Sequence, residues 1–289
     1  MRLAVIVPTY GRPALVARLL AHLSQQSRPP DRIVISAPDA SHVGELSAAA
    51  VPVEFSFGKH GLSAQRNQAL EKVLGDTDVV VFFDDDFVPA NDYIELLERG
   101  FAKHPDWVAV TGHVIADGIK GRGIAFDEAI AAIAGDARSI RHWRWREVFS
   151  TYGCNMAFRT NSIGPLRFDE RLPLYGWQED VDFSSQMRSA GRVVKLDSIR
   201  GVHLGAKAGR VSGRRFGYSQ VVNPIYLIRK GTVTGKRGLA LIARNLAANT
   251  VRSIWSEPHI DRRGRFVGNL IGLLHLAKGR IEPEHALKL

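Results

Sequence analysis

Val79-Val80-Val81-Phe82-Phe83-Asp84-Asp85-Asp86 is the stretch that decides the fold. Its five β-branched or aromatic apolar residues predict a strand buried on both faces, and three carboxylates follow at its C-terminal end. Adjacent carboxylates beside a core repel one another unless a cation neutralises them. Because ligands bind at the carboxyl ends of strands in open α/β sheets, we expect a divalent metal here with a phosphate-bearing substrate behind it. The alternative is a solvated acidic turn.

The overall composition is that of a globular protein without disulfides. A chain of 289 residues with 45% apolar content fits one large domain, or a domain with a C-terminal extension. The single cysteine, Cys154, excludes an internal disulfide and suits a reducing compartment. The N-terminal apolar run is too short for a signal peptide, and no stretch reaches the roughly 18 to 20 apolar residues of a membrane-spanning helix. We therefore expect a cytoplasmic protein, free or peripheral on the inner face of the cytoplasmic membrane.

The net charge of +10 is distributed unevenly along the chain. Residues 200–289 contain 17 Lys and Arg against 4 Asp and Glu, which is +13, so the preceding residues sum to −3. The basic character therefore belongs to the C-terminal third. Such a surplus points to a separate task, such as contact with anionic lipid or another polyanion.

The first 115 residues alternate strand-like and helix-like patterns, which predicts an α/β fold with a mostly parallel sheet sandwiched by helices. The expected strands are 3–7, 32–36, 51–55, 78–83, 107–115, 154–159 and 193–196. The expected helices are 14–24, 63–74 with Ser63 as N-cap, 91–103 and 180–190. Residues 117–150 begin with a glycine-rich loop and are predicted to be an insertion or a mobile flap.

The C-terminal third is predicted to be a basic helical extension with helices at 214–230, 239–255 and 266–277. The last of these is apolar and is bracketed by basic residues on both sides. A segment of this length cannot span a bilayer, but it can lie in the membrane interface with its basic flanks on head groups. An ordinary helix packed on the rest of the protein explains the same pattern, and both interpretations stay open.

Two strings near the N-terminus have the residue types of a nucleotide site. In the first, a strand stops at Pro8 and leaves Thr9 and Tyr10 at its carboxyl edge, where an aromatic ring can stack on a base. In the second, Gly61 permits close approach, and the helix after it offers free N–H groups to an anion. Arg66 in that helix can reach a base edge or a phosphate. Each string alone also fits a common turn or a capped helix.

Two acidic strings complete the pattern. In the triple aspartate, Asp84 and Asp86 alternate to one face and Asp85 to the other. Mg²⁺ takes oxygen ligands and typically binds one or two carboxylates plus substrate phosphates. In Trp177-Gln178-Glu179-Asp180-Val181-Asp182, carboxylates at a helix start are explained by the helix dipole, and one of them can also serve as a general base.

Taken together and in this order, these strings resemble the family 2 glycosyltransferases, which are inverting enzymes of the GT-A fold. The resemblance covers about residues 1–205 and is carried by VIVPTYGRP, GLSAQRNQAL, FFDDDFVP, GCNMAFR, FDERL, WQEDVDFS and VHL. It implies a GT-A, Rossmann-like catalytic domain over residues 1–205 and a basic helical region over 206–289.

The resemblance implies a nucleoside diphosphate sugar as donor, most often UDP- or dTDP-linked, and Mg²⁺ or Mn²⁺ as cofactor. The residues implied in nucleotide-sugar binding are Pro8, Thr9, Tyr10, Arg12, Asp39, Arg66, Asp84 and Asp85. Asp86 and His203 are the implied metal contacts, and a simple strand-end histidine is the alternative for His203.

Asp180 matches the residue that acts as catalytic base in the family, with Glu179 and Trp177 on the acceptor side. The implied reaction is a single displacement in which the metal offsets charge on the departing diphosphate and Asp180 takes the proton of the acceptor hydroxyl. Attack from the opposite face inverts the anomeric carbon. Trp177 fits a core tryptophan almost equally well.

One position departs from the family pattern. The family places an aspartate directly after its second strand to read the base, whereas Ser36 stands there in this chain and Asp39 follows three positions later. Either Asp39 substitutes through a longer loop or base recognition differs.

Many relatives build cell-surface polysaccharide, so we expect a glycan or lipid-linked glycan acceptor and contact with an anionic membrane surface. A sugar-nucleotide nucleotidyltransferase is the alternative function, but it would normally carry a longer glycine-rich and basic phosphate loop after the first strand. Nucleic acid is not an expected partner, because the basic residues form no recognised binding module and the carboxylate cluster repels phosphate.

Overall fold

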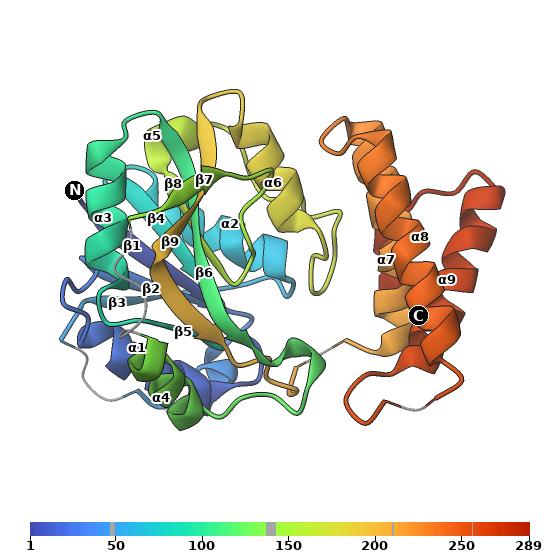
Figure 1. The fold of residues 1–289 in the computed structure, drawn as a ribbon, viewed down its shortest axis with the longest axis horizontal. Helices are drawn as coiled ribbons and strands as arrows, with labels where there is room; N and C mark the ends of the chain where they lie inside the picture. Colours follow the sequence, from blue (N-terminus) through green and yellow to red (C-terminus); the bar gives the residue numbers. More distant parts are fainter. Residues whose placement is uncertain (47–49, 137–142, 210, 256) are drawn as a thin grey trace.

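The computed structural model describes residues 1–46, 50–136, 143–209, 211–255 and 257–289. It contains a nine-stranded mixed sheet flanked by helices, with three further helices standing to one side (Figure 1). The strands follow the order β3-β2-β1-β4-β8-β6-β9-β5, and β7 pairs with β9. Their bounds are β1 Leu3–Pro8, β2 Arg32–Ala37, β3 Val53–Phe57, β4 Val79–Phe83, β5 Phe87–Pro89, β6 Trp107–Asp117, β7 Trp145–Glu147, β8 Asn155–Arg159 and β9 Arg192–His203.

The first four strands form a parallel unit in the order β3-β2-β1-β4. Strand β8 then pairs antiparallel with both β4 and β6, and β9 runs parallel to β6. The α/β expectation is confirmed. All four strands of the parallel unit end at the same sheet edge, and this edge receives Pro8 from β1 and Asp84 after β4.

Helices cover both faces of the sheet because the strand residues alternate between two cores. Leu3, Val5 and Val7 of β1 face the core formed with α1 Pro13–Ser24 and α3 Tyr93–Lys103. Ala4 and Ile6 face the opposite core, which includes α2 Leu62–Val73, α5 Thr160–Ile163 and α6 Glu179–Met187. The sheet is therefore buried on both faces, as the apolar run of β4 predicts.

Two expectations about elements need revision. The N-cap of α2 is Gly61, with φ 127°, and not Ser63, because the glycine adopts a backbone conformation that few other residues tolerate. The predicted insertion contains the helix α4 Phe126–Asp136 and strand β7, so it is partly regular structure; residues 137–142 lie outside the described part. Short helical turns occur at η1 Ala40–His42, η2 Gly118–Lys120 and η3 Pro283–Lys288.

After β9 the chain forms three helices, α7 Gly213–Lys230, α8 Gly235–Arg252 and α9 Arg262–Ala277. Helix α9 packs along α7, and α8 contacts both. In the ranges given above, no helix is long and apolar enough to cross a bilayer.

Candidate active site

A cavity of about 890 Å³ opens at the carboxyl edge of β1 and β4 and extends to the C-terminal helices. One wall carries the triple aspartate and the residues after β1, and the other carries the start of α7 and residues 257–261 before α9. Of the residues proposed from sequence, those on the wall are Pro8, Thr9, Tyr10, Arg12, Asp84, Asp85, Asp86 and His203.

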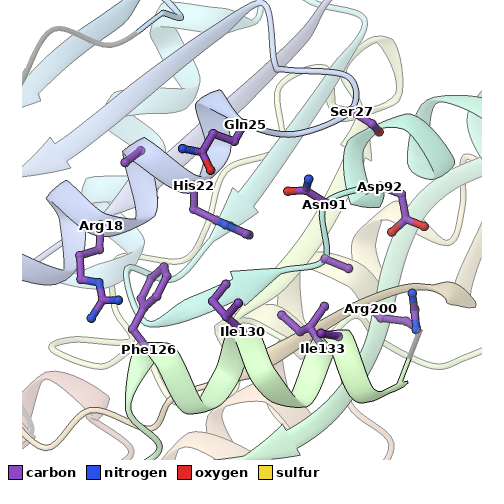
Figure 2. Close-up of a pocket in the computed structure, with 13 residues that line it drawn as sticks. Arg18, His22, Gln25, Ser27, Asn91, Asp92, Phe126, Ile130, Ile133 and Arg200 are labelled. Carbon is purple, nitrogen blue, oxygen red and sulfur yellow. The ribbon is translucent and has the colours of Figure 1, made fainter. Parts of the chain in front are cut away.

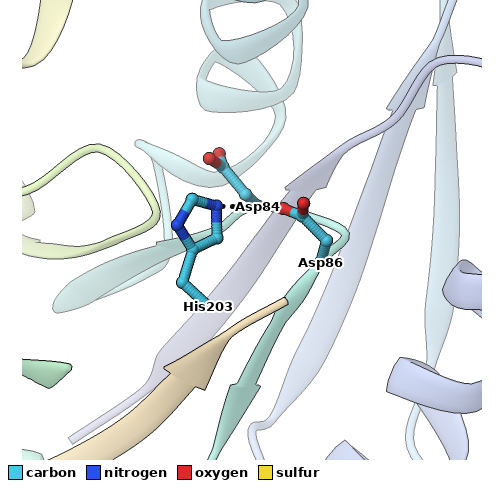
Figure 3. A group of neighbouring side chains, drawn as sticks. All are labelled: Asp84, Asp86 and His203. Carbon is cyan, nitrogen blue, oxygen red and sulfur yellow. Dashed lines mark ion pairs between the residues drawn. The ribbon is translucent and has the colours of Figure 1, made fainter. Parts of the chain in front are cut away.

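A tight turn after β4 separates the three carboxylates. The strand ends at Phe83, and the backbone N–H of Phe87 donates to the carbonyl of Asp84 at 2.9 Å. Asp84 and Asp86 each offer an oxygen to a cluster that also includes a ring nitrogen of His203, with all three ligand atoms within 4.8 Å of one another (Figure 3). Asp84 and Asp86 therefore lie together and Asp85 lies apart, as expected, but a turn and not strand alternation separates them.

Asp85 is directed toward the β1 side of the cavity. Its carboxylate accepts hydrogen bonds from Thr9 Oγ1 and Arg12 Nη1, both at 2.7 Å. Burial raises the pKa of Asp85 to about 7, against the opposing charge of Arg12. Asp85 thus fixes Thr9 and Arg12 on the wall.

His203 is held between two carboxylates. Its Nε2 lies 3.4 Å from Asp86 Oδ1, and its Nδ1 lies 3.0 Å from Asp117 Oδ1. Burial disfavours the imidazolium, but the two carboxylates outweigh this effect and raise the pKa of His203 to about 10. Burial likewise works against ionised Asp86, yet His203 and Arg12 lower its pKa to about 2.

These three side chains fit a divalent cation. Two carboxylate oxygens and one imidazole nitrogen form a common donor set for divalent cations, and carboxylates in particular suit Mg²⁺ and Mn²⁺. Asp117 supplies the partner on the second ring nitrogen of His203 that metal-binding histidines usually have. A cation binding there must displace the proton from Nε2, so binding is coupled to pH.

Arg66 lies behind the wall and organises two acidic residues. Its side chain is fully buried, donates to Asp84 Oδ1 at 3.0 Å and to the Gly153 carbonyl at 2.9 Å, and pairs with Glu179. Burial and the charge of Asp180 raise the pKa of Glu179 to about 8. In this structure the guanidinium of Arg66 is thus engaged by protein groups.

Asp180 is anchored by two backbone donors. The N–H of Gly153 donates to Oδ2 at 2.9 Å and the N–H of Val181 donates to Oδ1 at 2.8 Å. Burial raises the pKa of Asp180, and these hydrogen bonds oppose the shift. A Cβ on Gly153 would lie 3.4 Å from Asp180 Oδ2 and 3.2 Å from Glu179 Oε1, so glycine permits this close packing.

The segment that leads into α6 has an unusual backbone. Leu174, Gly176 and Gln178 all have positive φ, at 58°, 62° and 79°. Positive φ in residues other than glycine costs free energy and is concentrated at functional sites. Leu174 and its neighbour Tyr175 lie on the cavity wall, so this segment, which leads into the helix that carries Asp180, shapes one side of the cavity.

The expected base-reading positions lie outside the cavity. Ser36 is buried in the sheet, where its hydroxyl donates to the Ser56 carbonyl at 3.3 Å, and Asp39 is largely exposed and caps the short turn η1. The ring of Tyr10 instead stacks with His42 and with His60, at centroid distances of 4.5 and 4.2 Å.

Five residues proposed from sequence do not line the cavity, and these are Asp39, Arg66, Trp177, Glu179 and Asp180. Trp177 contacts Phe216 of α7, with 5.8 Å between ring centroids. The sequence reasoning missed several wall residues, among them His60, Gln65, Tyr175, Arg215 and Arg265. It also missed Asp117, which is the last residue of β6 and lies two positions beyond the end of the predicted strand 107–115.

A second cavity of about 730 Å³ lies between α1, α4 and the turn after β5 (Figure 2). Its labelled side chains include Arg18, which lies over the Phe126 ring at 4.3 Å, and Arg200, which pairs with Asp136. The wall is mainly apolar and lies apart from the carboxylate cluster. We therefore place the candidate active site in the larger cavity.

Comparison with known proteins identifies the family. The model for glycosyl transferase family 2 matches residues 4–164, which is more than half of the chain. The chain belongs to glycosyl transferase family 2. A relative from Haloferax volcanii, glucosyl-dolichyl phosphate glucuronosyltransferase, is 36% identical over 100 residues, covering 34% of this chain and 31% of that protein. The match thus spans about a third of the curated relative.

Solved structures support the GT-A-like fold of this family member. S. aureus TarS 1-349 in complex with UDP-GlcNAc aligns with a TM-score of 0.57 at 16% identity, over 95% of this chain and 81% of that one. For a longer TarS chain, the alignment covers 44% of the TarS chain. Mannosyltransferase PcManGT from Pyrobaculum calidifontis, solved with GDP-Man and Mn²⁺, aligns with a TM-score of 0.52 at 16% identity, over 99% and 85% of the two chains.

Proposed function

We propose that the protein transfers a sugar from a nucleoside diphosphate sugar to an acceptor hydroxyl with inversion at the anomeric carbon. The observation that carries the proposal is the cluster of Asp84, Asp86 and His203 on the wall of the large cavity, in a chain of this family. These three residues would hold Mg²⁺ or Mn²⁺. When bound, the cation supplies positive charge to stabilise the diphosphate leaving group.

The nucleoside end of the donor fits the β1 side of the cavity. Tyr10 and His60 provide aromatic surface there, and Thr9 and Arg12 are held by Asp85. Structural neighbours include complexes with UDP-GlcNAc, UDP and GDP-Man. A UDP- or dTDP-linked donor remains our proposal. Asp39 does not line the cavity, and its role in base reading stays a prediction.

Asp180 is the proposed general base. Its two backbone hydrogen bonds fix the carboxylate, and the raised pKa strengthens it as a proton acceptor. It would remove the proton from the acceptor hydroxyl as the oxygen attacks the anomeric carbon. The proposed acceptor-side residues are Trp177 and Glu179, and Glu179 forms an ion pair with Arg66.

The acceptor is proposed to be a glycan or a lipid-linked glycan. A sugar-nucleotide nucleotidyltransferase, the alternative function, would consume a nucleoside triphosphate. It is not favoured, because the family match and the solved neighbours are glycosyltransferases.

A donor screen with Mn²⁺ or Mg²⁺ tests the proposal by following release of the nucleoside diphosphate. We expect a sugar nucleotide to release its nucleoside diphosphate. We expect no release of inorganic diphosphate from a nucleoside triphosphate. Asp180→Asn should bind donor with unchanged affinity and lose transfer by about 10²- to 10⁴-fold, because a general base contributes about that much. Retained transfer in this variant removes Asp180 from the base role.

A further inference from the structure

The interior of the three C-terminal helices contains a network of buried polar side chains beside an apolar cluster. Asn249 donates to Asn269 and to Gln220 at 2.9 and 2.8 Å, and Arg262 donates to Asn249 at 3.1 Å. Asn269 in turn donates to the backbone carbonyl of Gly217 at 2.7 Å. These side chains are buried. Hydrogen-bonded amides thus occupy positions where a water-soluble helical bundle normally has aliphatic side chains.

The outward side of α9 carries a row of apolar side chains. Helix α9 turns its small residues toward α7, where a Cβ on Gly268 would lie 2.0 Å from the Arg214 carbonyl. Its opposite side exposes Val267, Leu270 and Leu274 at the helical spacing i, i+3, i+7, and Leu274 is 60% exposed. A row of exposed aliphatic side chains opposite a packed face is expected for a surface that does not face water.

A second apolar group lies where α8 leads into α9. Ile254 and Trp255 are 68% and 66% exposed, and Val251 on the last turn of α8 is also exposed. The side chain of Arg263 donates to the Ser253 carbonyl at 3.3 Å, which joins this group to the start of α9. We define the outer apolar face as Val251, Ile254, Trp255, Val267, Leu270 and Leu274.

Charge decides which partner fits this face. Helices α8 and α9 contain lysine and arginine but no aspartate or glutamate. Arg263, Lys278 and Arg280 are exposed at the two ends of α9. A second copy of the chain would bring these like charges together, which is unfavourable, whereas acidic head groups complement them. Apolar side chains with basic flanks are characteristic of helices that lie in a membrane interface.

We propose that the outer apolar face inserts into the head-group region of an anionic bilayer and presents the cavity to a lipid-linked acceptor. Residues 257–261, which follow Trp255 almost directly, form part of the cavity wall. Insertion of Ile254 and Trp255 therefore brings the cavity mouth close to the membrane surface. The choice of acceptor rests on the proposed function, while the membrane contact stands on the surface alone. Figure 1 shows α7–α9 on one side of the molecule, beside the sheet and its helices.

Vesicle flotation of the full chain tests the membrane contact. The probes are vesicles of phosphatidylcholine alone and vesicles with about a third phosphatidylglycerol. We expect flotation with the anionic vesicles, weakened by salt. The double variant Ile254→Ser and Trp255→Ser should lower the partition coefficient by about tenfold or more, because both side chains lose apolar burial in lipid. A variant with Arg263→Gln and Lys278→Gln should weaken binding to anionic vesicles only.

Matched controls lie on the catalytic side. Phe57→Ser removes an exposed apolar ring on β3, and Lys72→Gln removes an exposed charge on α2; neither should change flotation. Equal flotation of wild type and the Ile254 and Trp255 variant overturns the proposal, as does wild-type protein that stays with the aqueous fraction. If the wild type is a dimer that does not bind vesicles, and this variant is a monomer, the face binds a second copy of the chain.

Binding of UDP in the presence of Mn²⁺ separates this proposal from the proposed function. Ile254 and Trp255 lie outside the cavity wall, so calorimetry should give the same UDP affinity for the double variant and the wild type. Loss of flotation with intact UDP binding supports the membrane contact and leaves the donor site standing. Flotation without any UDP binding instead contradicts the donor site and leaves the membrane contact standing.

Discussion

Single residues show how the three adjacent carboxylates coexist. Each has its own cationic partner: Arg66 for Asp84, Arg12 for Asp85 and His203 for Asp86. The charge problem visible in the sequence is thus solved first by protein groups. A cation at Asp84, Asp86 and His203 would replace the proton of the imidazole, and the carboxylates would remain compensated.

Asp117 is predicted to be a positioning residue for His203. Asp117→Asn should weaken Mn²⁺ binding in the presence of UDP by about 10- to 100-fold, because the carboxylate fixes the ring and increases the basicity of Nε2. Titration of free Mn²⁺ by electron paramagnetic resonance measures this affinity. Asp127→Asn, which removes an exposed carboxylate from α4, is the control and should bind Mn²⁺ like the wild type. Equal affinities for both variants would show that Asp117 has no such role.

The sequence could predict those site residues whose position depends on one strand end. Apolar runs predict the strands that precede Pro8, Thr9 and the triple aspartate, and all of these residues line the cavity. The location of Arg66 could not be predicted, because the sequence around it indicates neither that its side chain is buried nor which residues it contacts. Burial of its guanidinium depends on Asp84 and Glu179, which come from distant elements.

At the scale of elements, the parallel unit was predictable and the rest of the sheet was not. Strands β1 to β4 follow the alternating pattern, which favours neighbouring parallel strands. Strand β8 instead inserts between β4 and β6, and β9 pairs with β6 through several register shifts. These pairings bring Asp117 opposite His203. Since they join segments far apart in the chain, no local periodicity encodes them.

Lys230, the last residue of α7, joins the C-terminal end of this helix to the sheet side. Lys230 Nζ lies 2.6 Å from Asp169 and 2.7 Å from the buried Asp182, which also accepts from Thr232. Lys230→Met should lower the free energy of unfolding by about 1–3 kcal/mol, because Asp182 loses one partner while retaining Thr232. Arg229→Met, at the exposed neighbouring position, is the control and should have little effect. Urea denaturation measures both.

The same contact has a defined pH dependence. Burial disfavours ionised Asp169, but hydrogen bonds from Lys230 and Tyr226 outweigh it and lower its pKa. A lowered carboxylate pKa stabilises the folded state above its ordinary value of about 4, and the stabilisation is lost as the pH falls through the lowered value. The difference between wild type and Lys230→Met should therefore shrink in acid. A constant difference from neutral pH into acid would contradict the assignment.

At the scale of the whole molecule, the cavity is built from both parts of the chain. The sheet side supplies the carboxylates, and the C-terminal helices supply Arg215, Arg265 and residues 257–261. A boundary near residue 205 stays a prediction, as does a cytoplasmic location. The charge distribution distinguishes the basic C-terminal third in the sequence. The contribution of this third to the cavity wall depends on how α7 packs against the sheet side, and composition does not reveal that packing.

The segment between β9 and α7 should become protected when donor binds. The N–H of Ala206 donates to Asp86 at 2.8 Å, Arg12 donates to the Ala208 carbonyl at 2.8 Å, and Lys207 lies on the cavity wall. A nucleoside diphosphate with Mn²⁺ in the cavity would add contacts on both sides of this segment. We expect UDP with Mn²⁺ to slow trypsin cleavage after Lys207 and to leave cleavage after the exposed Lys278 unchanged, as followed by mass spectrometry. Cleavage after Lys207 at the same rate with saturating ligand would place the donor elsewhere, whereas equal slowing at both sites would indicate general stabilisation by ligand binding.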